Sequence, residues 1–138
     1  MSANSFFLIP RPPFRLDLTV WTLRRRPDNA IDRWDGQIYR RVLPLSDGAV
    51  EVAVKQVGLP DAPKLEIAVE GRLQHTHTKA AVSSDLQRLL GLGLDLGSFY
   101  RFAARHKTLH ALAMRFRGMK PPRFASVFEG LINAIACQ

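Results

Sequence analysis

Three consecutive segments of the chain alternate apolar with polar residues, and turn-forming residues stand between them. The segments cover residues 37–43, 49–57 and 64–71, and Asp-Gly or Gly- and Pro-rich turns precede each one. Successive side chains of a strand point to opposite faces, so the second segment has Val50, Val52 and Val54 on one face and the third has Leu65, Ile67 and Val69. The faces of the first segment are mixed, and one is only partly apolar. Turns of this length and composition favour direct antiparallel connections. The middle of the chain is therefore predicted to be an antiparallel meander.

The residues ahead of this meander are predicted to be extended and then helical. Residues 6–13 end in a proline-rich run, which indicates an extended arm, and residues 15–18 alternate as a short strand would. The apolar spacing then becomes helical from residue 19 until Pro27 ends the helix. The side chains predicted to be buried in this helix are Val20, Leu23 and, as a third candidate, Trp21.

After Arg72 the apolar period changes from two to that of helices. A helix capped by Ser83 or Ser84 is predicted to end at Gly91, and helical stretches follow over residues 98–106 and 109–114. The loop of residues 118–123 contains two consecutive prolines, so it is predicted to be non-helical.

The last helix is predicted over residues 125–138, with Ser126 as its N-cap and Glu129 at the third helical position. This helix reaches the last residue without a glycine or proline stop, which leads us to expect a chain cut from a longer protein. Its apolar residues recur at helical spacing and are expected to face inward. They are Phe128, Leu131, Ile132 and Ile135.

Together these elements predict an α+β fold. It comprises an antiparallel β-sheet of about five strands with packed helices, followed by the first helices of an all-α domain. We place the N-terminal sheet domain with its flanking helices at residues 1–97 and the start of a truncated helical domain at residues 98–138.

Charge narrows the class of partner. The chain has a net charge of +8 and an isoelectric point of about 10.6, which favours DNA, RNA or an acidic membrane surface. Residues 98–138 hold seven basic residues against one acid, Glu129, so a polyanion is expected to meet this third of the chain first. The single cysteine, Cys137, and the lack of a long apolar run predict a cytoplasmic protein that does not enter membranes.

No motif of catalysis stands out. The glycines of GLGLDLG lack the spacing of a nucleotide-binding loop and fit a helix cap followed by a turn better. His75 and His77 lack a third ligand at the spacing of a metal site. We expect them to be surface residues in a turn. The carboxylates are scattered, and no nucleophile motif is present. We therefore predict no catalytic residue, no metal and no cofactor in this chain.

Four basic residues surround the glycine and prolines of the stiff loop that leads into the last helix. Their charged heads are expected to project near a helix N-terminus, where phosphate groups bind well. A charged loop that is merely solvated, without a phosphate partner, would have the same composition. The candidate DNA-binding residues are Arg115, Arg117, Lys120 and Arg123. Gln138 is a fifth candidate, from a family resemblance.

The stretch from Phe99 to Gln138 resembles the 3-methyladenine DNA glycosylase type II family, within the helix-hairpin-helix DNA glycosylase superfamily. The resemblance covers nearly the whole chain and is strong from Leu89 onward. Before Leu89 only the order of helix, meander and helix is similar to that family's N-terminal sheet domain. The matching positions are Phe99, Tyr100, Ala103, Gly118, Met119, Lys120, Pro122, Phe128, Glu129, Leu131, Ile132, Ala134, Ile135 and Gln138.

The resemblance implies a parent enzyme that flips alkylated purines out of double-stranded DNA and hydrolyses their N-glycosidic bonds. In that family the wedge residue lies just after the position of Gln138, and the catalytic aspartate lies further on. The resemblance therefore implies a non-catalytic portion that supplies scaffold and DNA-backbone contacts. Two alternatives remain: a stand-alone nucleic-acid-binding module, and an inert structural domain whose last helix pairs with a partner or a second copy.

Overall fold

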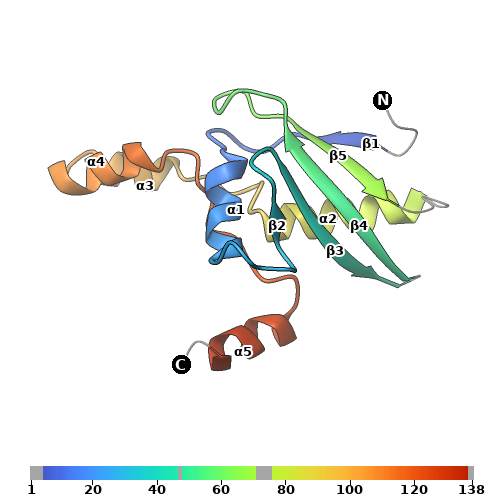
Figure 1. The fold of residues 1–138 in the computed structure, drawn as a ribbon. Helices are drawn as coiled ribbons and strands as arrows, with labels where there is room; N and C mark the ends of the chain where they lie inside the picture. The colour runs from blue at the N-terminus through green and yellow to red at the C-terminus, as the bar shows by residue number, and fades with distance from the viewer. Residues whose placement is uncertain (1–4, 47, 71–75, 137–138) are drawn as a thin grey trace.

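The computed structural model describes residues 5–46, 48–70 and 76–136, and it confirms the α+β class. One five-stranded sheet is covered on one face by two helices, and three further helices extend from this body (Figure 1). In chain order the elements are β1 (Ser5–Leu8), α1 (Leu16–Arg24), β2 (Arg33–Trp34), β3 (Ile38–Leu45), β4 (Gly48–Gln56), β5 (Leu65–Glu70), α2 (Thr76–Leu89), α3 (Gly97–Ala103), α4 (Lys107–Arg115) and α5 (Val127–Ala136).

All strand pairs in the sheet are antiparallel, in the order β1-β5-β4-β3-β2. Within the meander, Val52 lies opposite Val69 and Val54 lies opposite Ile67, so the faces predicted from the alternation are confirmed. The turn before β3 is also as predicted: the Asp35 carboxylate accepts the backbone N–H groups of the two residues after Gly36. The arm expected at the N-terminus becomes edge strand β1, paired with β5.

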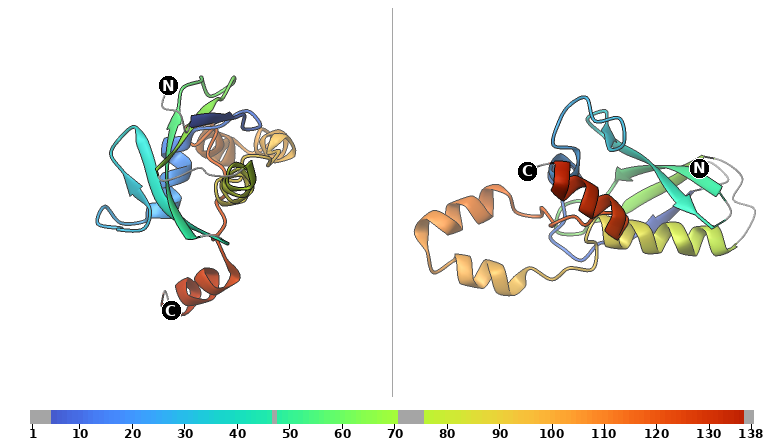
Figure 2. Two further views of the ribbon diagram at one scale, coloured as in Figure 1. Left: turned by 90° about the vertical axis from the view of Figure 1, so that its right-hand side faces the viewer. Right: turned by 90° about the horizontal axis from the view of Figure 1, so that it is seen from below.

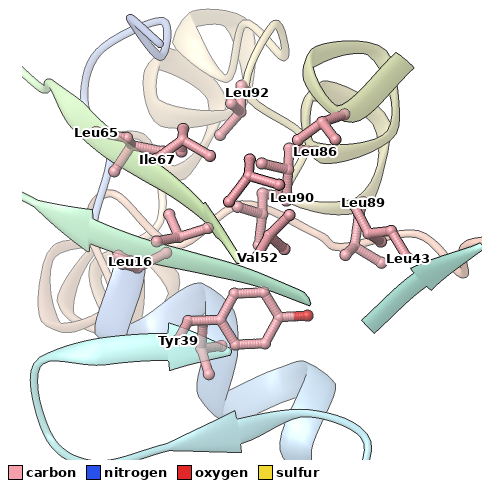
Figure 3. Packing of buried hydrophobic residues seen from close by; sticks show 14 of the residues in the cluster. Leu16, Tyr39, Leu43, Val52, Leu65, Ile67, Leu86, Leu89, Leu90 and Leu92 are labelled. Atoms are coloured by element: carbon pink, nitrogen blue, oxygen red, sulfur yellow. The ribbon is translucent and has the colours of Figure 1, made fainter. Parts of the chain in front are cut away.

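The hydrophobic core lies between the inner face of the sheet and helices α1 and α2. Leucines of α2 meet valines and leucines of the central strands in Figure 3. Each fully buried side chain of this size stabilises the fold by about 1.5–3 kcal/mol. The largest apolar members are Tyr39, Phe14, Leu16, Leu43, Leu65, Ile67, Leu86, Leu89 and Leu90.

Helix α1 begins at Leu16, so the strand predicted over residues 15–18 is wrong. Leu16 and Val20 stand one helical turn apart and are both buried, a spacing that the short alternation concealed. The first turn is secured by the Gln56 side chain, whose Oε1 accepts the Leu16 N–H at 2.8 Å. Of the three residues considered for the buried side, Trp21 is instead exposed.

Helix α2 begins at Thr76, so the prediction that Ser83 or Ser84 caps it is wrong. The Ser83 hydroxyl donates to the Lys79 carbonyl, one turn earlier, at 2.7 Å, which satisfies it inside the helix. The predicted end is confirmed, because Gly91 follows the helix with φ at +61°.

Helices α3 and α4 form a hairpin that projects from the body, and α5 projects separately (Figures 1 and 2). The linker after α4 is fastened to the start of α1, where the Arg15 N–H donates to the Gly118 carbonyl at 2.7 Å. Gly118 has φ at +92°, and a Cβ there would lie 3.1 Å from the Arg15 nitrogen. Only glycine suits both constraints.

The apolar residues of α5 do not face inward as expected. The helix has no buried residue, and Phe128 is 73% exposed. The physical reason is that α5 projects beyond the sheet and α2 instead of lying against them (Figure 2). Leu131, Ile132 and Ile135 are also more than half exposed.

Candidate nucleic-acid interface

A groove of about 840 Å³ lies between α5 on one side and the end of α1 with its following loop on the other. The α5 wall is apolar, because Phe128, Ile132 and Ala136 recur every four residues and so share one helical face. The opposite wall is polar and carries three consecutive arginines, Arg24 to Arg26. Residues of α1, its following loop, the linker and α5 complete the lining: Thr22, Leu23, Asp28, Asn29, Ile31, Asp32, Pro122, Phe124, Glu129 and Asn133.

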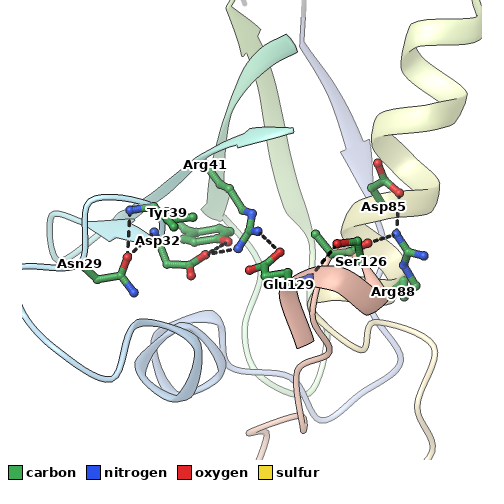
Figure 4. A network of polar contacts seen from close by, with 10 residues as sticks. Asn29, Asp32, Tyr39, Arg41, Asp85, Arg88, Ser126 and Glu129 are labelled. Atoms are coloured by element: carbon green, nitrogen blue, oxygen red, sulfur yellow. Dashed lines mark hydrogen bonds and ion pairs between the residues drawn. The ribbon is translucent and has the colours of Figure 1, made fainter. Parts of the chain in front are cut away.

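A buried ion network ties α5 to the sheet beside this groove (Figure 4). Arg41 of β3 donates to Asp32 at 2.8 Å and, through its other terminal nitrogen, to Glu129 of α5 at 2.6 Å. The Tyr39 hydroxyl donates to the same Asp32 oxygen at 2.7 Å. Arg41 and Asp32 are buried, so one guanidinium binds two of the carboxylates that line the groove.

The protonation states of Tyr39 and Arg41 are fixed across the physiological range. Burial is the main cause that raises the pKa of Tyr39 far above its usual value, and the Asp32 charge adds to it. Burial acts to lower the pKa of Arg41, but its hydrogen bond to Glu129 and the Asp32 charge outweigh this and leave the pKa raised. Tyr39 is therefore a neutral donor and Arg41 a permanent cation.

The N-terminal end of α5 has its own attachments. The Ser126 hydroxyl accepts the Glu129 N–H at 3.1 Å, which confirms Ser126 as the cap. Arg88 of α2 donates to the Ala125 carbonyl at 2.6 Å and pairs with Asp85 at 3.1 Å. Polar contacts, more than burial, thus position this helix.

The arginines at the end of α1 face the groove in different ways. Arg25 has φ at +54°, a region that residues with a Cβ rarely adopt, and its Nη1 donates to Asn133 of α5 at 2.9 Å. Arg24 donates to the Pro27 carbonyl, while Arg26 is exposed. Sequence reasoning missed this cluster, because cations are common in the last turn of any helix. The run of three arginines was the available signal.

The sequence-predicted site residues do not all gather in one place. Arg115 and Arg123 are exposed. The backbone of Arg123 is held in place, because its N–H donates a hydrogen bond to the Leu89 carbonyl. Arg117 pairs with Asp61 at 2.7 Å, an exposed contact that contributes little. Gln138 lies outside the described residues.

Lys120 corrects the expectation that the loop's charged heads all project. Its side chain is fully buried, and its Nζ donates to the Leu94 carbonyl at 2.6 Å. Its backbone N–H donates to the Thr19 hydroxyl, so the loop folds back onto α1. Burial lowers the pKa of Lys120, although the Asp95 charge opposes this. The residue fastens the linker and is closed to a phosphate.

The α3–α4 hairpin carries four exposed cations. Arg101 and Arg105 of α3 and its following turn, Lys107 at the start of α4 and Arg115 at its end are all exposed. No carboxylate is paired with Arg105, Lys107 or Arg115 in the described part of the chain. The basic character predicted for this third of the chain is therefore at the surface.

Residues with metal-binding potential do not converge within the described ranges, where no three His, Cys, Asp or Glu side chains meet. His77 lies exposed at the start of α2 instead of in the predicted turn, and His75 falls outside the ranges described. Among the same residues, no helix is long and apolar enough to cross a membrane.

Comparison with solved structures confirms the resemblance inferred from sequence. The chain is similar to a 3-methyladenine DNA-glycosylase from Archaeoglobus fulgidus, with a TM-score of 0.72 and 26% sequence identity. The match covers 96% of this chain and 44% of that one, so this chain spans less than half of the glycosylase's length. No protein-family model and no curated protein matches the sequence.

Proposed function

We propose that this chain is the DNA-handling N-terminal portion of a DNA-repair N-glycosylase that flips alkylated purines and hydrolyses their N-glycosidic bonds. The observation that carries the proposal is a groove with one apolar and one arginine-rich wall, set in a fold shared with a 3-methyladenine DNA-glycosylase. Base-flipping enzymes need a pocket beside a surface that holds the DNA backbone.

The groove suits the approach of an extruded purine. Phe128 and Ile132 offer a flat apolar surface, and Phe124 lies beside them in the linker. On the facing wall Arg26 is exposed and unpaired with any carboxylate among the described residues. It is placed to hold a phosphate while an apolar ring enters the groove.

Backbone contacts in this proposal come from exposed cations beside the groove, in the linker before α5 and on the α3–α4 hairpin. The candidates are Arg26 beside the groove, Arg123 in the linker, and Arg105, Lys107 and Arg115 on the hairpin. If four or five of them meet phosphates, DNA affinity falls roughly a hundredfold or more between about 50 and 200 mM salt.

The chain alone is proposed to be inactive in base excision. Hydrolysis of an N-glycosidic bond needs a carboxylate that is held close to the sugar and is not already bound to a cation of the protein. Of the groove carboxylates, Asp32 and Glu129 are both bound by Arg41, and Asp28 is exposed to water. Release of free alkylated adenine from damaged DNA by the purified chain would overturn this part of the proposal.

Binding is tested by fluorescence anisotropy with a duplex that carries an abasic-site analogue and with its undamaged counterpart, at two salt concentrations. We expect salt-sensitive binding with little preference between the two duplexes. Arg26→Ala is expected to weaken binding several-fold. Lys55→Ala is the matched control, because it removes one exposed cation from β4, away from the groove. No binding at low salt, or equal effects of the two variants, would contradict the proposal.

The exposed outer face of α5 supports a second candidate function, attachment to a protein partner or a second copy. Val127, Leu131 and Ile135 recur every four residues on this face and are 82%, 58% and 67% exposed. An apolar stripe of this kind marks an interaction surface. Sedimentation equilibrium over a range of concentrations tests it: dimerisation lost in Leu131→Lys would favour attachment, and a monomer at every concentration would exclude self-association.

A further inference from the structure

Trp21 is an unusually exposed tryptophan. It lies on α1 with 61% of its surface open, although tryptophan is on average a well-buried residue. Its ring is parallel to that of Phe116, which follows α4, with 4° between the planes and 6.2 Å between the centroids. This geometry lies within the range of an offset stack. One face of a two-ring stack is therefore presented to solvent.

The ring pair belongs to a different surface from the groove. Thr22 and Leu23, the next residues of α1, line the groove, whereas Trp21 does not. Trp21 and Phe116 instead join α1 to the base of the α3–α4 hairpin. A molecule that rests on them would thus lie outside the groove.

A cation lies beside this ring pair. The Arg115 guanidinium carbon lies 5.6 Å from the Phe116 ring centre. The carboxylate one turn before Trp21 is Asp17, which Arg15 already binds through two hydrogen bonds. The surface therefore combines an open aromatic face with positive charge.

We propose that Trp21 and Phe116 form a stacking platform for an unpaired base of a DNA strand, with Arg115 facing the adjoining phosphate. The proposal rests on the proposed function in that it takes DNA as the partner, and it adds a second base-binding surface outside the groove. Single-stranded nucleic acids bind in this way, on aromatic rings within a basic surface, and every base offers a flat face.

Charge favours a nucleic acid over another protein copy at this surface. Two chains of net charge +8 that met at this ring pair, each with Arg115 beside it, would repel each other. A DNA strand supplies both the flat ring and the negative charge that this surface lacks. Self-association through Trp21 is therefore the competing outcome that the experiment must separate.

The first measurement uses Trp34→Phe, because the chain contains two tryptophans and this variant leaves Trp21 as the sole reporter. Oligothymidylate and an undamaged duplex are titrated separately into the full chain. Stacking predicts saturable quenching of Trp21 fluorescence by oligothymidylate. Trp21→Leu, which retains only Trp34, serves as the control and should show no quenching.

The second measurement is the affinity for oligothymidylate by anisotropy. Trp21→Leu is expected to weaken binding by roughly five- to a hundredfold, the range that stacking of one base represents, and Trp21→Phe should retain most of the affinity. Phe7→Leu is the matched control. Phe7 is also exposed and has a lysine ammonium over its ring at 3.9 Å, but it lies on edge strand β1.

The outcomes separate this inference from the proposed function. Salt-sensitive duplex binding with unquenched Trp21 and an unimpaired Trp21→Leu variant would overturn the platform and leave the proposed function standing. Quenching by oligothymidylate without duplex binding would support the platform and count against duplex handling. Quenching that follows protein concentration without DNA would show self-association and overturn the platform. Failure to bind any DNA would overturn both.

Discussion

Replacing Arg41 with methionine removes a cation that binds two carboxylates, Asp32 and Glu129. The side chains of Arg41 and Asp32 are only 5% and 7% exposed, whereas that of Glu129 is 29% exposed. After the change Asp32 remains buried, and among the described residues its carboxylate keeps the Tyr39 hydroxyl as its hydrogen-bond donor. Breaking a buried pair from one side costs about 3–5 kcal/mol, because the remaining charge is left uncompensated.

We expect Arg41→Met to lower the free energy of unfolding by this amount, a large share of the roughly 5–15 kcal/mol available to a small protein. In urea unfolding followed by circular dichroism, the midpoint should fall by about 2 M if the slope is near 2 kcal/mol per molar. Arg40→Met is the matched control. Arg40 belongs to the same strand but pairs with Asp35 at the surface, so its loss costs at most about 1 kcal/mol.

A double variant tests the cause directly. Arg41→Met combined with Asp32→Asn removes the stranded charge, so its cost should be about 1–3 kcal/mol smaller than the sum of the two single changes. Equal costs for Arg41→Met and Arg40→Met, or strict additivity in the double variant, would refute the reasoning that burial of Asp32 makes Arg41 essential.

Three further changes follow from the same structure. Gly118→Ala should destabilise the chain by more than about 1 kcal/mol in thermal unfolding, because the residue has a positive φ and no room for a Cβ. Arg40 and two backbone N–H groups lower the pKa of Asp35 to about 2. The original chain should therefore be more stable than the Asp35→Asn variant above about pH 4, and this difference should disappear as the pH falls to about 2. A constant difference between pH 7 and pH 2 would contradict it. Lys120→Met should leave DNA affinity unchanged in anisotropy, because Lys120 is buried. Burial lowers the pKa of Lys120 below 10.5, so the original chain should gain stability as the pH rises towards that value, and the variant should lack this gain in urea unfolding.

The sheet was predictable from the sequence because its information is local. A strand repeats every two residues, and the pairs Val52 with Val69 and Val54 with Ile67 follow from alternation plus short turns. The start of α1 was mispredicted for the same reason. Residues 15–18 alternate as a strand would. The helix is recognisable only because Leu16 and Val20, which are one helical turn apart, are both buried.

The groove was not predictable, because its two walls are far apart in the sequence. Arg25 meets Asn133, and Arg41 meets Glu129, across separations of 108 and 88 residues. A basic loop could be recognised from composition, yet composition does not show that Lys120 turns inward while Arg123 stays outside. That difference depends on the Thr19 hydroxyl and the Leu94 carbonyl, which tertiary packing brings to Lys120.

The way α5 is held has a consequence for the groove that it lines. A helix with no buried residue gains little from the hydrophobic effect, so its place is set by the Arg41–Glu129 ion pair, the Arg25–Asn133 hydrogen bond and the capped N-terminus. Such contacts are directional, and they fix orientation more than they add stability. The width of the groove therefore depends on a few polar atoms. If an extruded base enters it, Glu129→Gln should alter the affinity for damaged DNA more than the stability of the sheet, since Arg41 would keep Asp32 as its partner.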